Sequence, residues 1–218
     1  MSESELLEKS NLLVLDVGIN HGTFSSFILD HVKGSRVIGV DAHLTFCELT
    51  RERLGIKVLN LLVRERADWS RFCLAKIEGD SFYQPRSVEV LNTYPNFTSQ
   101  DYFDIMERVE NITYIQSTTL DKLIAEYGIP DIIKLTIEGA ERLALQGLSQ
   151  KVSLIIVEWY MDKFGPTNLK LCVERLKELG YTQYAYTADQ TKLATDLTYR
   201  DLASFELPTE QKGLLYAK

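Results

Sequence analysis

Mostly apolar runs alternate with amphipathic stretches along the first third of the chain. The runs at 12–17, 36–40 and 56–63 are typical of parallel strands that are covered on both faces. Between them, 23–33 and 44–54 carry apolar side chains at helical spacing, and a glycine follows each stretch. Three strands alternating with two helices predict right-handed βαβ units and a parallel sheet. A helix is the alternative for 56–63, because this run lacks clean alternation.

The same alternation returns in the second half of the chain. We expect strands there at 112–116, 131–137, 154–158, 181–187 and 213–217, and helices at 119–127, 140–148 and 166–179. Pro166 and Gly180 stand where a helix typically starts and stops. A further short helix is expected at 2–9, before the first strand.

Residues 64–118 follow a less regular pattern. The stretches 72–77 and 81–83 are predicted to form a hairpin, because a Glu-Gly-Asp sequence separates them. A loop is expected at 85–98 and a short amphipathic helix at 100–109. We interpret the whole segment as an insert or lid over the sheet.

Composition limits the class of protein and its partners. The 218 residues are 45% apolar, which suits one well-cored domain over residues 1–218. The net charge of −7 argues against a nucleic-acid partner, which needs a basic face. Cys47, Cys73 and Cys172 lack metal-ligand spacing, so we expect a reducing compartment and no metal centre. No signal peptide or membrane-spanning run is evident, which predicts a soluble, cytoplasmic protein with no membrane partner.

Polar residues occur where four of the predicted strands end. They are the segments 16–22 and 136–141, together with Asp41 and Glu158. In a doubly wound sheet, ligands bind outside the carboxyl ends of the strands, where the strand order reverses. Glycines let the backbone approach a ligand closely, and a helix that begins after the turn offers free N–H groups. The sequence therefore predicts a site for a nucleotide-like ligand at these strand ends.

Asp41 closes the second predicted strand. A carboxylate there can accept two charge-assisted hydrogen bonds from the vicinal hydroxyls of a ribose, each contributing roughly 1.5–3 kcal/mol. It would also repel a 2′-phosphate. The alternative is that Asp41 only caps the helix that follows it.

The first turn distinguishes NAD from S-adenosylmethionine. A dinucleotide fold requires G-x-G-x-x-G, with the start of the helix facing a pyrophosphate. This chain has Asp16, Gly18, Asn20 and Gly22, so a side chain occupies the place of the second glycine. Asn20 would obstruct a pyrophosphate and Asp16 would repel it, whereas a zwitterionic amino-acid tail suits this turn. The pattern favours S-adenosylmethionine.

Five segments resemble the FkbM family of methyltransferases, in the family's order: LDVGINHGTFS, VIGVDAH, TTLDKLI, IIKLTIEGAERLALQGL and IIVEWY. The resemblance covers residues 12 to 160 and is weakest between 64 and 110. It implies a Rossmann-like α/β fold with a seven-stranded, mostly parallel sheet and helices on both faces. It also implies S-adenosyl-L-methionine as the methyl donor and O-methylation of a small-molecule or sugar acceptor. The cofactor-binding residues that it implies are Asp16, Gly18, Ile19, Asn20, Gly22, Thr23, Asp41, Ala42 and Thr136.

Two positions depart from the family pattern. Thr136 stands where the family motif K-I-D-x-E-G-x-E has an acid, so this position can form a hydrogen bond but holds no charge. Ala42 and His43 follow Asp41, where the family more often has a proline. The first departure leaves open a cofactor-binding module that has lost methyl transfer. A nicotinamide-dependent oxidoreductase is a third alternative, against which Asn20 argues.

Methyl transfer to a hydroxyl needs a base in addition to aligned reactants. Glu138 follows the predicted strand at 131–137, which neighbours the first strand in the expected order of the sheet. We therefore nominate Glu138 as the base. The alternative is that Glu138 and Gly139 only form the turn between strand and helix. His21 and His43 flank the cofactor turns, and His21 is the second candidate catalytic residue. A hydrogen-bonded structural role is the alternative for both histidines.

Two charged and two aromatic residues lie within or directly after two neighbouring predicted strands. Lys134 lies in an apolar strand and Glu158 lies in the neighbouring one. A buried ammonium and a buried carboxylate are each costly alone, so we predict that Lys134 and Glu158 form an ion pair. Trp159 and Tyr160 are candidates either for the wall of an acceptor pocket or for the core.

Overall fold

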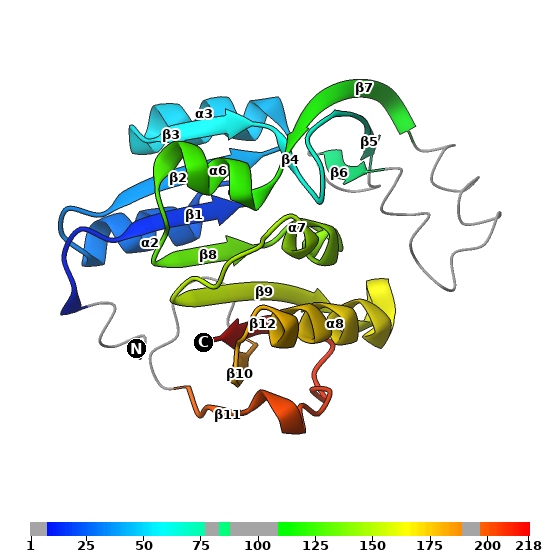
Figure 1. Cartoon of the computed structure of the whole chain (residues 1–218). Helices are drawn as coiled ribbons and strands as arrows, with labels where there is room; N and C mark the ends of the chain where they lie inside the picture. Colours follow the sequence, from blue (N-terminus) through cyan, green and yellow to red (C-terminus); the bar gives the residue numbers. More distant parts are fainter. Residues whose placement is uncertain (1–7, 77–82, 88–108, 189–196) are drawn as a thin grey trace.

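A mostly parallel sheet runs through the centre of the computed structural model (Figure 1). The structure describes residues 8–76, 83–87, 109–188 and 197–218. Within these residues the central sheet has eight strands. They are β1 (Leu13–Val17), β2 (Arg36–Asp41), β3 (Lys57–Asn60), β8 (Ile132–Leu135), β9 (Leu154–Tyr160), β10 (Gln183–Thr187), β11 (Arg200–Asp201) and β12 (Lys212–Ala217).

The strands follow the order β11-β10-β12-β9-β8-β1-β2-β3. β1 pairs in parallel with β2 on one side and with β8 on the other, and β3 and β9 extend the parallel arrangement. β12 runs antiparallel to both β9 and β10. The strand order reverses between β1 and β8, which is where doubly wound sheets place their ligands. The expected seven-stranded Rossmann-like sheet is confirmed, with the two-residue β11 as an additional edge strand.

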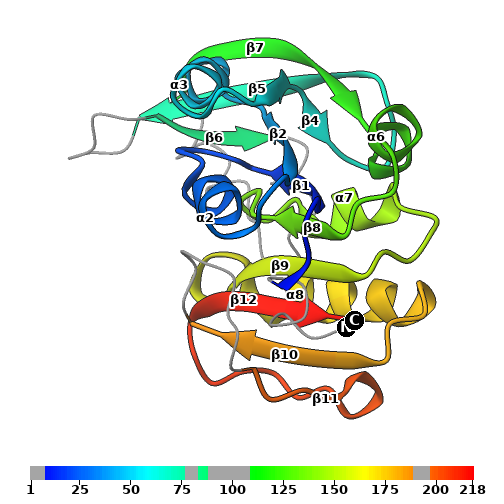
Figure 2. The same cartoon turned by 90° about the vertical axis from the view of Figure 1, so that its left-hand side faces the viewer.

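Helices cover both faces of this sheet (Figure 2). The side chains of β1, β8, β9 and β12 alternate between two apolar clusters, one on each face. The helices are α2 (Thr23–His31), α3 (Leu44–Leu54), α6 (Leu120–Tyr127), α7 (Glu141–Gln146) and α8 (Met161–Glu178). α2 and α3 lie on one face, and α6, α7 and α8 lie on the other. In β1, Val14 packs against the α2 face, while Leu15 and Val17 pack against the opposite helices.

A second, smaller sheet occupies the segment whose sequence pattern is irregular. Its strands are β4 (Leu62–Val63), β5 (Trp69–Lys76), β6 (Tyr83–Ser87) and β7 (Val109–Thr118), in the order β4-β7-β5-β6. In Figure 1 this sheet lies at the upper right, beyond the carboxyl ends of the parallel strands. The four strands of the small sheet therefore lie at the end of the main sheet where the predicted ligand site is located.

The small sheet agrees with only part of the prediction for this segment. β5 and β6 are antiparallel neighbours, as expected of the predicted hairpin. Residues 85–87 form part of β6 rather than a loop, since β6 is an edge strand and an edge strand tolerates Pro85. The predicted helix at 100–109 lies outside the described residues except for Val109, which begins β7.

Several other boundaries differ from the predicted ones. The 56–63 run forms two strands, β3 and β4, which belong to different sheets. α8 begins at Met161, directly after β9, so that Pro166 lies inside the helix and not at its start. The predicted helix at 2–9 lies outside the described residues except for its last two positions. Among the helices that the structure describes, none combines the length and the apolar character that crossing a membrane requires.

Candidate functional site

The turn after β1 is hydrogen-bonded to the end of β2. The amides of Gly18 and Ile19 donate to the Val40 carbonyl at 2.8 and 3.1 Å. The Asn20 amide donates to Asp41 Oδ2 at 2.9 Å. The two strand ends, which the sequence predicted to contribute to one site, therefore form a single connected surface.

Left-handed backbone explains why this turn needs its glycines and its asparagine. Gly18, Asn20 and Gly22 have φ values of +78°, +48° and +67°, a region that favours glycine and admits asparagine. A Cβ atom on Gly18 would lie 1.9 Å from the Thr136 carbonyl oxygen, so the first turn packs directly against the end of β8. The spacing of these three residues thus brings β1, β2 and β8 together at the switch point.

Side chains of α3 hold the outer part of the turn. Thr50 Oγ1 donates to the Asn20 carbonyl at 2.7 Å, and the Arg53 guanidinium donates to the His21 carbonyl. A Cβ atom on Gly22 would lie 2.7 Å from the Thr50 methyl carbon. The conformation of the turn is therefore fixed from two sides, by β2 and by α3.

α2 begins at this turn with an open amino terminus. Its N-cap is Gly22, no side chain caps it, and its first turn has no acidic residue. Thr23, the first helical residue, is exposed. The first amides of a helix carry a partial positive charge and bind anionic groups. This end of α2 is consequently suited to a carboxylate.

Asp41 is buried, with 8% of its surface exposed, and both of its oxygens accept backbone hydrogen bonds. Oδ1 accepts from the His43 amide at 2.8 Å, and Oδ2 accepts from the Asn20 amide. Burial raises the pKa of Asp41 above its ordinary value, against the lowering effect of these two bonds. The N-cap of α3 is His43, so the interpretation of Asp41 as that helix's cap is wrong. A carboxylate has four acceptor positions, which leaves capacity for ligand hydroxyls.

Ile19 and Ala42 contribute by packing and backbone contacts. Ile19 is 3% exposed and packs against Cys47 and Val58. The Ala42 carbonyl accepts a hydrogen bond from Asn60 Nδ2 at 2.9 Å. Ile19 therefore belongs to the core beneath the turn, and Ala42 fixes the loop between β2 and α3.

Asp16 and Lys134 form a buried ion pair, with 3.5 Å between Oδ1 and Nζ. The two residues are direct partners in the register of β1 and β8. Ser25 Oγ donates to Asp16 Oδ2 at 2.6 Å. The predicted pair of Lys134 with Glu158 is wrong, because Lys134 pairs with Asp16, its direct neighbour on β1.

Thr136 connects this ion pair to the first turn. Lys134 Nζ donates to Thr136 Oγ1 at 2.7 Å, and the hydroxyl donates to the Gly18 carbonyl at 3.0 Å. Thr136 thus uses both hydrogen-bonding functions of its hydroxyl within the protein. A family-type acid here would place a second carboxylate beside Lys134 but could not donate to Gly18.

The turn after β8 contains Glu138, the candidate base. Glu138 and Gly139 have φ values of +53° and +95°. Glu141 Oε1 accepts from the Ile137 amide at 2.9 Å and from the Gly139 amide at 3.3 Å. The sequence reasoning did not single out Glu141, although the E-G-x-E spacing resembles a side chain that reaches back to the amides preceding a helix. Glu138 lies at the same edge of the sheet as the first turn.

Aromatic side chains border the turn on the α3 side. The His21 ring lies 4.9 Å from the Phe46 ring, edge to face, and the His43 ring lies 4.7 Å from it. Trp159 is 3% exposed and belongs to the core, whereas Tyr160 is partly exposed. Of the two aromatic residues proposed for an acceptor wall, only Tyr160 is therefore accessible.

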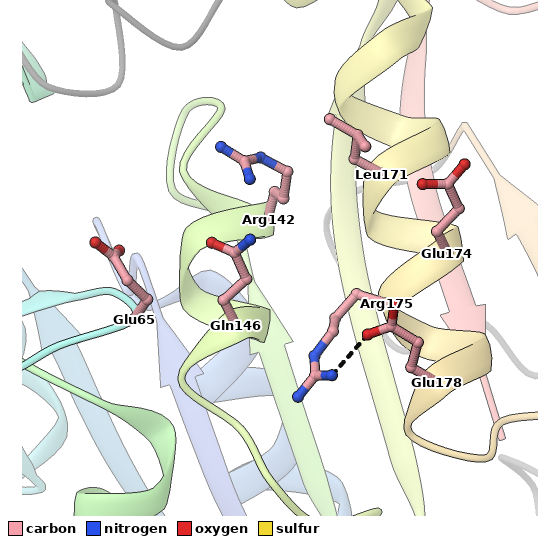
Figure 3. A pocket seen from close by; sticks show the side chains of 7 residues that line it. All are labelled: Glu65, Arg142, Gln146, Leu171, Glu174, Arg175 and Glu178. Carbon is pink, nitrogen blue, oxygen red and sulfur yellow. Dashed lines mark hydrogen bonds and ion pairs between the residues drawn. The ribbon is translucent and has the colours of Figure 1, made fainter.

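A polar groove of about 480 Å³ lies elsewhere, between α7 and α8 (Figure 3). Its walls are formed by Glu65, Arg142, Gln146, Leu171, Glu174, Arg175 and Glu178. Arg175 is engaged in the structure, with an ion pair to Glu178 at 2.7 Å and a hydrogen bond to the Leu148 carbonyl. None of the predicted site residues lines this groove.

The strand-end arrangement has a glycine turn, an open helix terminus and a buried acid on the second strand, which are typical of nucleotide-cofactor sites in Rossmann-like folds. The family described as "Methyltransferase FkbM domain" matches residues 16–182. The chain therefore belongs to the FkbM methyltransferase family, and the resemblance noted in its sequence is confirmed.

Solved structures of methyltransferases align along nearly the whole chain at low identity. The precorrin-6y C5,15-methyltransferase of Geobacter metallireducens has 8% identity and a TM-score of 0.48, over 99% of this chain and 85% of its own. A Bacillus cereus O-methyltransferase in complex with SAH has 9% identity and a TM-score of 0.47, over 99% and 77%. Aeropyrum pernix fibrillarin with bound S-adenosyl-L-methionine has 9% identity and a TM-score of 0.47, over 96% and 67%. Comparison with curated proteins gives no match.

Proposed function

We propose that this FkbM-family protein transfers a methyl group from S-adenosyl-L-methionine to an oxygen of a small molecule or sugar. The observation that carries the proposal is the Asn20–Asp41 hydrogen bond beside the open end of α2. This bond joins the carboxylate that would bind the ribose to the turn that leads into the helix terminus that would bind the methionine carboxylate. The net charge of −7 supports a small acceptor rather than a nucleic acid.

The residues present fit the methionine cofactor better than a dinucleotide. Asp41 would accept hydrogen bonds from the ribose hydroxyls, and the first amides of α2 would bind the methionine carboxylate. Asn20, in the left-handed region with an exposed side chain, occupies the position where a pyrophosphate site needs glycine. Asp16 is paired with Lys134 and accepts a hydrogen bond from Ser25, so its role would be to stabilise the buried base of the site and not to contact the cofactor.

The chemistry requires alignment and one proton acceptor. When bound, the cofactor supplies a methyl group activated by a positively charged sulfur. Glu138 would accept the proton of the acceptor hydroxyl. The hydroxyl oxygen would form the new bond to the methyl carbon as the bond between that carbon and the sulfur breaks. His21 is the second candidate for this proton, since it lies in the first turn.

Calorimetry with S-adenosylmethionine, S-adenosylhomocysteine and NAD tests the cofactor. We expect micromolar or tighter binding of the first two and none of NAD. Release of S-adenosylhomocysteine across a panel of sugars and small hydroxylated compounds then tests transfer. Binding of NAD alone would contradict the proposal.

A cofactor-binding module without transfer is the second candidate, and Thr136 in place of the family acid favours it. Tight binding of S-adenosylhomocysteine with no turnover on any acceptor, in both the unmodified protein and Thr136→Asp, would support the module. Turnover that appears only in Thr136→Asp would show that this threonine limits activity.

A further inference from the structure

Glu141 holds both ends of the turn that carries Glu138. One oxygen, Oε1, accepts from the Ile137 amide at 2.9 Å and from the Gly139 amide at 3.3 Å. Between these two amides, Glu138 has a φ of +53°, a conformation that glutamate rarely adopts. Such a conformation persists only when its surroundings fix it, and here a single carboxyl group bonds to both sides.

The surroundings of Glu141 keep it in place and in its neutral form. It is 2% exposed, and Asn168 Nδ2 of α8 donates to its Oε2 at 3.4 Å. Burial, and after it the nearby carboxylate of Glu158 on β9, raise the pKa of Glu141 to about 8, against the lowering effect of its backbone hydrogen bonds. Cys172 of α8 also lies within electrostatic range, and its own pKa is raised by burial. At neutral pH, Glu141 therefore acts as an uncharged hydrogen-bonding group.

This turn also packs against the first turn. A Cβ atom on Gly18 would meet the Thr136 carbonyl oxygen at 1.9 Å and the Ile137 methyl carbon at 3.0 Å. A shift of residues 137–139 would consequently displace Glu138 and disturb the contact between β1 and β8.

We propose that Glu141 is a positioning residue, which sets the direction of Glu138 at the donor site by bonding to the Ile137 and Gly139 amides. This inference rests on the proposed function, in which Glu138 accepts the proton. Glu141 itself contacts no substrate, because it is buried beneath the turn. A purely structural Glu141 would affect folding but would not act through Glu138.

Residue-resolved amide hydrogen exchange, which needs no substrate, tests whether Glu141 fixes the conformation of the turn. In Glu141→Leu, which removes the acceptor oxygens, we expect the Ile137 and Gly139 amides to exchange about tenfold faster or more. In Glu141→Gln, whose amide oxygen still accepts both bonds, they should exchange within about threefold of the unmodified protein. Tyr181→Phe is the matched control, because it removes two buried hydrogen bonds between the Tyr181 hydroxyl and the Val152 backbone, away from the site. Unchanged exchange in Glu141→Leu overturns the proposal.

Turnover, measured as release of S-adenosylhomocysteine with an acceptor that the panel identifies, tests the action through Glu138. We expect Glu141→Leu to lower kcat about as much as Glu138→Gln, with the Kd of S-adenosylhomocysteine changed less than about threefold, and Glu141→Gln to restore kcat. Tyr181→Phe should lower the melting temperature and leave kcat unchanged. The same result for Glu141→Leu would overturn the positioning role. Full activity of Glu138→Gln would refute the base assignment alone. If no cofactor binds, the proposed function fails, while the exchange measurement still decides whether Glu141 fixes the turn.

Discussion

Asp16 and Lys134 are in-register partners across β1 and β8, and their carboxylate and ammonium groups form a buried ion pair. The exposed fractions of the two side chains are 1% and 8%. Lys134 also donates to Thr136, whose hydroxyl donates to the Gly18 carbonyl. The contact that joins the two strands at the switch point is therefore continuous with the turn that forms the proposed donor site.

Removing one member of this pair should be strongly destabilising. In Lys134→Met, the Asp16 carboxylate would stay buried without its counter-ion, which costs roughly 3–5 kcal/mol in comparable buried pairs. Chemical denaturation followed by circular dichroism measures the change in the free energy of unfolding. The double variant Lys134→Met/Asp16→Asn should recover a large part of the loss, because no uncompensated charge remains.

The matched control for this prediction is the exposed pair of Lys9 and Asp131, which are 3.4 Å apart. Exposed pairs contribute about 0–1 kcal/mol, so Lys9→Met should change stability by no more than that. Equal effects of Lys134→Met and Lys9→Met would contradict a stabilising role for the buried pair.

Asp41 should determine the affinity for the cofactor. Asp41→Ala removes the proposed acceptor of the ribose hydroxyls and releases the Asn20 amide, so we expect the Kd of S-adenosylhomocysteine to rise about tenfold or more. Isothermal calorimetry measures it. Asp131→Ala is the control. Asp131 also accepts a hydrogen bond from a backbone amide, that of Leu13, but it lies next to the start of β8, at the end of the strand away from the candidate site. If both variants bind alike, Asp41 serves the turn and not the ligand.

Much of the fold could be predicted from the sequence, because strong local signals mark its elements. The bounds of α3 agree with the prediction, and Gly55 ends it in the left-handed conformation. Thr119 caps α6 by accepting a hydrogen bond from the Lys122 amide. The start of α8 could not be predicted in the same way, because β9 leads directly into the helix and Pro166 is tolerated within it.

The conformation of the first turn could be predicted because backbone conformation there dictates residue type, whereas the side-chain pairing of Lys134 could not, because it depends on strand register. The spacing of Gly18, Asn20 and Gly22 indicated the turn because the left-handed region restricts which residues fit. The partner of Lys134 depends on which residues face each other across β1, β8 and β9, which apolar patterns alone do not determine. Glu141 was overlooked because its function depends on burial, and burial is a property of the folded chain.

Thr136→Asp tests whether the missing family acid weakens the donor site. The new carboxylate would lie beside Lys134 and the Gly18 carbonyl, where it could attract the ammonium and sulfonium charges of S-adenosylmethionine. We expect the Kd of S-adenosylmethionine for Thr136→Asp to fall by about tenfold, which is the effect expected of one charge-assisted contact. Thr136→Asn, which has the same shape without the charge, should remain within about threefold. Identical affinities in the two variants would mean that position 136 does not face the ligand.

The raised pKa of Glu141 predicts how stability depends on pH. In the folded protein this carboxyl has a pKa of about 8, against an ordinary value of 4.5, so the unfolded chain releases a proton that the folded chain retains. The contribution of Glu141 to stability is therefore complete below about pH 4.5 and declines as the pH rises through 8. Glu141→Gln keeps the two backbone hydrogen bonds that Oε1 accepts and cannot ionise. We expect the free energy of unfolding of Glu141→Gln, relative to the unmodified protein, to increase from pH 5 to about pH 8 and to level off toward pH 9 in urea titrations. A difference that stays constant over this range would show that Glu141 ionises in the folded protein as readily as in the unfolded chain.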